Sequence, residues 1–241
     1  SESDIAILDT EDMFTERDRD TEYDESECTA ISLSDEETKC DSDGVKMDGQ
    51  TVTITEGGTY LLTGSLSNGS VVVDTDKTEK VQLILENVSI INEEGAGICV
   101  EQADKVFITL ADGSTNKIVS NSFTGNKDTN IDGAIFSRED LTLNGSGTLK
   151  ITSAAHGIVS KDDLVLTGGV YQIQSEKQGL SGKESVRIAD GTFTITSGTD
   201  AIHSEDTDED TKGFVYITGG VLTLAAGGDG ISSSYVVQAD G

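Results

Sequence analysis

Six acidic residues gather between Asp200 and Asp210, in the sequence DAIHSEDTDED. Asp206, Asp208 and Asp210 alternate along this stretch, as oxygen ligands do at the start of a calcium-binding loop. The EF-hand pattern is not met, because no glycine stands at the sixth position and no glutamate at the twelfth. The sequence therefore predicts a calcium site that other parts of the chain must complete.

Further carboxylates recur in turns at equivalent places along the chain. If the chain stacks in register, such turns lie about 4.8 Å apart, and their repulsion needs a compensating cation. Salt bridges to Arg138, Lys161 and Lys183, or plain solvation, are the alternative interpretation. The predicted calcium ligands are Asp162, Asp163, Glu184, Asp200, Glu205, Asp206, Asp208, Asp210 and Asp229.

Basic residues in these turns, and Arg187 on the strand that follows one of them, are the candidates for catalysis. A lyase that cleaves uronates needs a base for the C5 proton and a cation for the carboxylate, which Arg138, Lys161, Lys183 and Arg187 could supply. These residues follow the repeat instead of departing from it, which favours binding over catalysis. The GxSxG, HExxH, P-loop and dinucleotide-binding motifs are absent from the sequence. We therefore expect no catalytic residue and keep a polysaccharide lyase as the alternative.

Rows of polar residues on the expected strands are candidates for glycan binding. Lys150, Gln172, Thr194 and Thr223 occupy equivalent positions, and such rows suit either an extended glycan or simple solvation. The predicted carbohydrate contacts are Lys150, Lys161, Gln172, Lys183, Arg187 and Tyr216.

These residues are positioned by an internal repeat of about 22 residues. The segments AIFSREDLTLNGSGTLKIT, GIVSKDDLVLTGGVYQIQ and GLSGKESVRIADGTFTIT share one template. This period predicts an all-β fold, a right-handed, single-stranded parallel β-helix with three short strands per coil. A leucine-rich repeat has a similar period, but its LxxLxLxxN spacing is missing. The expected inward columns are Leu141, Leu164, Val186 and Val215, and Ile151, Ile173, Ile195 and Leu224.

The repeat also indicates the domain organisation. Residues 1–50 are expected to form an acidic N-terminal arm and capping segment, and residues 51–241 the β-helix domain, with its last coil incomplete. Residues 116–131 are expected to loop out of the stack as an insertion.

The composition restricts the possible partners. The net charge of -29 disfavours nucleic acid and anionic lipid, and no apolar run is long enough to span a membrane. With three cysteines, a zinc site is not expected, although Cys28 and Cys40 could form a disulfide in an exported protein.

The chain resembles a known bacterial family, the calcium-containing carbohydrate-binding proteins with a pectate-lyase-like parallel β-helix, which recognise cellulose and pectic glycans. The resemblance is carried by MFTERDRDTEYDES, VTITEGGTYLLTGSL, ADKVFITLADGSTN, AIFSREDLTLNGSGTL, HGIVSKDDLVLTGG and GLSGKESVRIADGTFTITSG, in this order. It covers almost the whole chain.

The resemblance implies a non-catalytic protein that binds a plant cell-wall glycan, cellulose or pectin (polygalacturonate). It also implies calcium held between coils, at Asp162, Asp163, Glu184 and the loop from Asp200 to Asp210. The chain departs from a regular acidic position at Gly133 and Gln178. The implied location is extracellular or on the cell surface, as a secreted protein or as a lipoprotein after removal of a signal segment.

Overall fold

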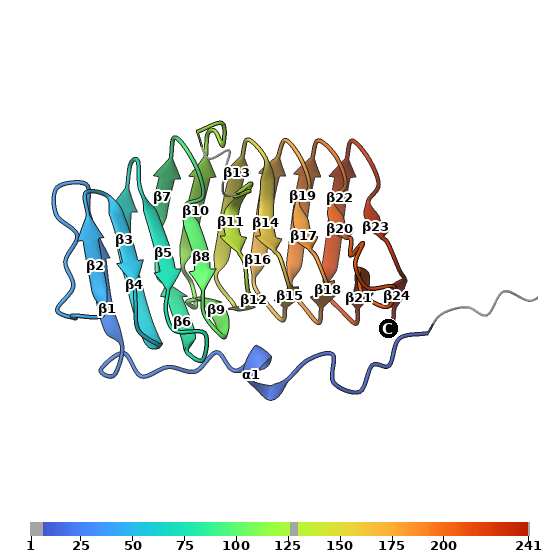
Figure 1. Ribbon diagram of the computed structural model, residues 1–241, viewed down its shortest axis with the longest axis horizontal. Coiled ribbons are helices and arrows are strands. Elements are labelled where there is room, and N and C mark those ends of the chain that lie inside the picture. The colour runs from blue at the N-terminus through green and yellow to red at the C-terminus, as the bar shows by residue number, and fades with distance from the viewer. Residues whose placement is uncertain (1–6, 126–129, 241) are drawn as a thin grey trace, which may run out of the picture.

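The computed structural model describes residues 7–125 and 130–240, which form 24 strands and one four-residue helix (Figure 1). All strand pairs are parallel except the antiparallel pair β2 (Val45–Asp48) and β3 (Thr51–Ile54). Successive strands climb along one axis, so the chain is a right-handed parallel β-helix and the predicted fold is confirmed. In the described residues, no helix is long and apolar enough to cross a membrane.

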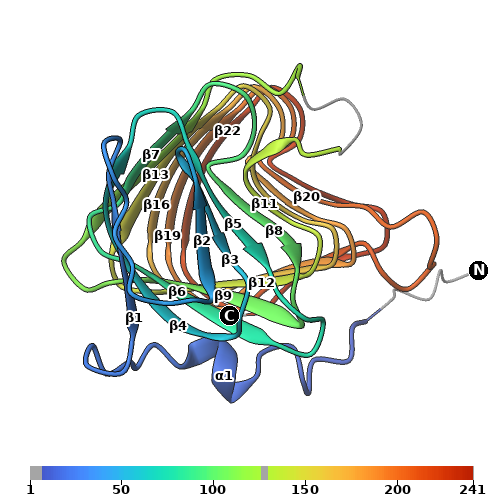
Figure 2. The ribbon, with the colours of Figure 1, turned by 60° about the vertical axis from the view of Figure 1, so that its left-hand side comes forward.

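Each coil contributes strands to three faces, always in the same order. We call them the hairpin face, the strap face and the open face. The hairpin face begins with the antiparallel pair and continues through β5 (Ser70–Asp74), β8 (Ile98–Gln102), β11 (Gly133–Ser137), β14 (His156–Ser160), β17 (Leu180–Gly182), β20 (Ile202–Ser204) and β23 (Ile231–Ser233). The strap face is covered by the N-terminal residues 7–28, which we call the strap (Figure 2). It contains β1 (Thr29–Leu33), β4 (Gly58–Leu66), β6 (Lys80–Leu85), β9 (Lys105–Leu110), β12 (Asp140–Gly145), β15 (Asp163–Leu166), β18 (Ser185–Ile188), β21 (Phe214–Ile217) and β24 (Val237–Ala239).

Among residues 7–125 and 130–240, no segment covers the middle strands of the third face, the open face (Figure 2). It contains the end of β4 and then β7 (Ser89–Asn92), β10 (Thr115–Ser120), β13 (Thr148–Ser153), β16 (Val170–Ser175), β19 (Thr192–Ser197) and β22 (Val221–Ala226). Side chains on β13, β16 and β19 alternate between buried and exposed or partly exposed, because one side of each strand faces the core and the other faces solvent.

The predicted core columns are present. Leu141 pairs with Leu164, and the column continues through Val186 to Val215, each completely buried. The second column also has the expected register, Ile151 to Ile173 to Ile195 to Leu224. Inside the open face, the rings of Tyr171 and Phe193 stack with centroids 4.7 Å apart. Because apolar burial contributes about 25 cal/mol per Å², these continuous columns are the main stabilising feature.

Glycines allow the tight corners between faces. Gly145 has φ +95°, and a Cβ atom there would lie 2.2 Å from the carbonyl oxygen of Leu110 on the preceding coil. Only glycine combines this backbone conformation with such a close approach.

Two sequence expectations need adjustment. The insertion begins later than expected, because residues 116–120 form most of β10 and pair in register with β13. Residues 126–129 of that expected insertion lie outside the described residues. Cys28 and Cys40 are free thiols in the structure, so the disulfide is not present there.

Candidate functional site

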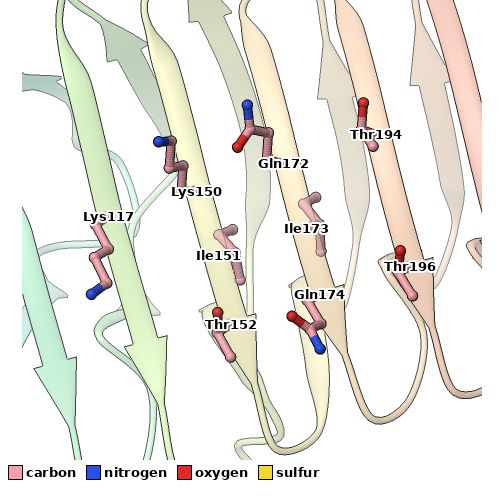
Figure 3. A pocket seen from close by; sticks show the side chains of 9 residues that line it. All are labelled: Lys117, Lys150, Ile151, Thr152, Gln172, Ile173, Gln174, Thr194 and Thr196. Carbon is pink, nitrogen blue, oxygen red and sulfur yellow. The ribbon is translucent and has the colours of Figure 1, made fainter.

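Polar side chains form straight rows on the open face. The pairing register places Lys117, Lys150, Gln172, Thr194 and Thr223 in one row across five strands. Figure 3 shows the first four of these side chains at successive strands. The sequence therefore placed Lys150 and Gln172 correctly relative to each other.

A second row runs beside the first one. Thr152, Gln174 and Thr196 pair in register and, with the first four residues of the first row, line a shallow hollow of about 420 Å³ (Figure 3). The hollow presents hydroxyl, amide and ammonium groups, which can hydrogen-bond to the hydroxyl and carboxyl groups of a sugar. Tyr171 and Phe193 point into the core from these strands and are fully buried, so their rings do not line the hollow.

The other predicted carbohydrate contacts lie on different faces. Lys161 and Lys183 border a hollow of about 280 Å³ on the hairpin face, together with His156 and His203. Lys183 Nζ lies 2.7 Å from Asp208 Oδ2, and this hydrogen bond raises the pKa of the lysine. The ammonium group of Lys183 is therefore held in its charged form.

Arg187 and Tyr216 lie beneath the strap. Arg187 donates to Asp163 at 2.7 Å and to the carbonyl oxygen of Met13 at 3.4 Å. Tyr216 is 5% exposed and stacks on Phe14 of the strap, with ring centroids 6.0 Å apart. The structure thus divides the six predicted contacts among three faces.

The predicted calcium ligands at the turn between the hairpin and strap faces fall in register but differ in their partners. Asp163 accepts hydrogen bonds from Ser185 at 2.5 Å and from Arg187, while Glu184 accepts one from Lys212 at 2.5 Å. Burial, together with the negative charges of Asp140 and Glu184, raises the pKa of Asp162 to about 7. Burial and the charge of Asp163 also raise the pKa of the neighbouring Asp140, so the surroundings disfavour the charges of both Asp140 and Asp162.

In the second group of predicted ligands, Asp200 and Asp229 lie on adjacent coils, as the stacking predicts. The backbone N–H of Asp229 donates to Asp200 Oδ1 at 2.8 Å, and Asp200 Oδ2 lies 2.9 Å from His203 Nδ1. Glu205 Oε2 lies 3.6 Å from His203 Nε2.

Within the acidic loop itself, Asp206 is bonded to the local backbone. Its Oδ1 accepts the N–H groups of Asp208 and Glu209, and these bonds lower the pKa of Asp206. Asp208 pairs with Lys183, and Asp210 is exposed. Among residues 7–125 and 130–240, no group of three or more His, Cys, Asp or Glu side chains is arranged to hold a metal ion, so the calcium ligands stay a prediction.

The contact between Asp18 and Lys105 was not expected from the sequence. Their side chains form an ion pair of 2.8 Å across 87 positions of the chain. The segment MFTERDRDTEYDES carried part of the family resemblance, but a pairing with the β-helix cannot be read from a segment that does not share the repeat.

Three comparisons with known proteins bear on this site. A family model described as "Carbohydrate-binding domain-containing protein" matches residues 48–241. A protein of that description from Acetivibrio thermocellus is 35% identical over 137 residues, which is 55% of this chain. The chain spans about half of that relative, since the match covers 48% of it.

A solved structure has a similar fold to this chain. It is the polysaccharide lyase-like protein from C. thermocellum, as a gadolinium derivative, with a TM-score of 0.79 and 29% sequence identity. The match covers 88% of this chain and 96% of the other one.

Proposed function

We propose that this chain, which belongs to the family of carbohydrate-binding domain-containing proteins, holds a polysaccharide on its open face without cleaving it. The observation that carries the proposal is the pair of exposed polar rows across β10 to β19, which line the hollow of about 420 Å³. Strands about 4.8 Å apart repeat the same polar groups along the axis, so an extended glycan meets similar contacts at each coil.

The chemistry of the rows suggests which glycan is bound. Gln172, Thr194 and Thr196 suit the hydroxyl groups of a neutral glycan such as cellulose, while Lys117 and Lys150 add positive charge at one end. That end suits the carboxylates of pectin or polygalacturonate. The proposed partner is therefore a plant cell-wall polysaccharide, and the proposed location is extracellular or on the cell surface.

Calcium is the proposed cofactor, and the acidic turn fits it better than the acidic loop does. The pKa of Asp162 is raised by burial first and then by the negative charges of Asp140 and Glu184, and a divalent cation bound there would relieve the repulsion between these carboxylates. The loop carboxylates Asp206 and Asp208 already accept backbone and lysine hydrogen bonds, so they would have to exchange these partners.

A polysaccharide lyase is the second candidate, because of the lyase-like structural neighbour and the hollow that contains Lys161 and Lys183. A lyase base must be unprotonated to remove the C5 proton, after which the C4–O bond breaks and a C4=C5 double bond forms. The raised pKa of Lys183 opposes that role, since its ammonium group stays protonated at neutral pH. Binding is therefore the better supported function.

The test is retention on insoluble cellulose and on calcium pectate gel. We expect the double variant Lys150→Ala/Gln172→Ala to bind roughly tenfold more weakly, because two polar contacts contribute about 0.5–1.5 kcal/mol each. Lys46→Ala is the matched control, since Lys46 is exposed on the hairpin face. Equal retention of both variants would refute the open-face site, and no retention of the wild type would indicate a purely structural protein. Unsaturated products detected by absorbance in the same mixture would instead identify a lyase.

A further inference from the structure

The strap crosses the coils of the β-helix along its axis. Near its start, the backbone N–H of Leu8 donates to Gln238 on β24, and further along Arg17 donates to Gln82 on β6 (Figure 1). The strap therefore runs along the length of the strap face, as an extended polymer bound to that face would.

The centre of the strap is held by one carboxylate. The Asp18 side chain is 3% exposed, and its Oδ1 accepts from Lys105 Nζ at 2.8 Å and from Thr142 Oγ1 at 2.6 Å. Burial opposes the ionisation of Asp18, but these hydrogen bonds outweigh it and lower the pKa of the carboxyl group. The sheet therefore contains a formed seat for a carboxylate, which we call the Lys105 seat: Lys105, Thr142, Asn144 and Phe107.

The surroundings of the seat are polar, although they are buried. Asn144 Nδ2 donates at 3.1 Å to the carbonyl oxygens of both Asp18 and Asp20, and Thr167 donates to the former at 2.6 Å. When such a segment leaves, water can satisfy these groups, so its departure costs less than uncovering an apolar face would. The apolar anchor of the strap, Met13 against Phe214 and Tyr216, lies five positions before Asp18 in the chain.

The Phe107 ring adds a flat surface beside the seat. Lys105 Nζ lies 5.3 Å and the Arg17 guanidinium 4.3 Å from the centre of this ring. An aromatic ring next to a carboxylate-binding lysine is suited to a ligand unit that has an apolar face and an acidic group.

The strap itself has the charge pattern of an acidic polymer. Residues 7–28 contain 10 of the 45 acidic residues of the chain and two of the 16 basic ones. Along the strap face this acidic segment contacts Lys105 through Asp18 and Arg187 through the carbonyl oxygen of Met13.

We infer that the Lys105 seat is a second binding site, for the uronic acid units of an acidic glycan, and that Asp18 on the strap occupies it as a built-in competitor. This site is separate from the open face and goes beyond the function proposed for it. An acidic glycan must displace Asp18 before its own carboxylate can bind Lys105 and Thr142. Binding at this site is therefore weak as long as the strap is in place.

The inference is tested with the full-length chain and trigalacturonate as the probe, by isothermal titration calorimetry. Asp18→Lys places a second ammonium group beside that of Lys105, and the repulsion between them displaces the strap. We therefore expect roughly tenfold tighter trigalacturonate binding. Adding Lys105→Ala to that variant is expected to abolish the gain. Glu16→Lys is the matched control, because it makes the same change of charge at an exposed position of the strap.

Cleavage by a glutamate-specific protease at Glu22, which the Asp18 and Glu16 substitutions leave unchanged, reports whether the strap has left the face. If Asp18→Lys keeps this bond protected, the seat accepts a lysine and does not select carboxylates, which overturns the inference. A released strap without a gain in binding, or a gain that survives Lys105→Ala, overturns it as well. Should Asp18→Lys fold poorly, the isosteric Asp18→Asn is expected to show a smaller gain with the same dependence on Lys105. The open-face variant Lys150→Ala/Gln172→Ala is expected to leave the gain unchanged, which separates the two sites.

Discussion

Asp162 and Asp163 are adjacent in the sequence, yet neutralising each of them is expected to change the stability in opposite directions. The pKa of Asp162 is raised from its ordinary value of 3.8 to about 7 by burial and by the neighbouring carboxylates. The native state therefore binds the proton more tightly than the unfolded state does, and the stability falls as the pH rises between these two values.

The magnitude follows from that displacement of the pKa. Without screening, the raised pKa corresponds to a loss of about 4 kcal/mol in the free energy of unfolding at pH 8. Solvent screening of the partly exposed Asp162 reduces this loss to about 1–2 kcal/mol. Asp162→Asn removes the repelling charge, so at pH 8 and without calcium we expect this variant to be more stable than the wild type by that amount. At pH 3.5 the carboxyl group of the native wild type is protonated and about two thirds of the carboxyl groups in the unfolded state are too, so the difference is expected to fall to a few tenths of a kcal/mol.

Urea unfolding of the wild type and of each variant at the two pH values measures these differences. Asp163→Asn is the matched comparison: it removes the acceptor of Arg187 and Ser185 and is expected to destabilise the protein by about 1–3 kcal/mol at pH 8. If Asp162→Asn is destabilising at pH 8, the carboxylates are compensated and the argument from crowding is wrong.

Three other outcomes are expected. If calcium binds the crowded turn, added calcium raises the Tm of the wild type at pH 8, a chelator reverses the rise, and Asp162→Asn shows less of it; an unchanged Tm in calorimetry would contradict this. Phe193→Ala is expected to cost about 3–5 kcal/mol in urea unfolding, with a coupling of about 0.5–1.5 kcal/mol to Tyr171 in a double-mutant cycle; additive effects would show that the stacking contributes nothing. Gly145→Ala is expected to destabilise more than Gly113→Ala, because both have positive φ but only Gly145 faces a close carbonyl oxygen; equal melting temperatures would argue against the close approach.

The fold could be predicted from the sequence because the same spacing recurs in successive coils. Each coil therefore provides a check on the register assigned to its neighbour. The spacings between Ile135, Ile158, Leu180 and Ile202 fix which residues pair, and all of these pairs are observed. Position within a coil, however, also decides the face. Lys161 and Gln172 are 11 positions apart and lie on different faces, although both were predicted to contact one glycan.

Contacts made by the strap could not be predicted in the same way. Arg187 and Tyr216 occupy paired positions on β18 and β21, where the repeat alone indicates solvent exposure. Residues 7–28 cover them through contacts that span about 170 to 200 positions and follow no period. Periodicity determines the coils, whereas the covering of a face depends on individual side chains.

The lengthened coil that carries the acidic loop has a consequence for engineering. Twenty-nine residues separate Ile202 from Ile231, yet these two residues pair as directly as those 22 apart. Extra chain at a corner is therefore tolerated, because each coil depends on its immediate neighbours alone. Corners of this scaffold are suitable places for grafting foreign loops. Duplicating a whole 22-residue unit should lengthen the protein by one coil without changes to the sequence of the other coils.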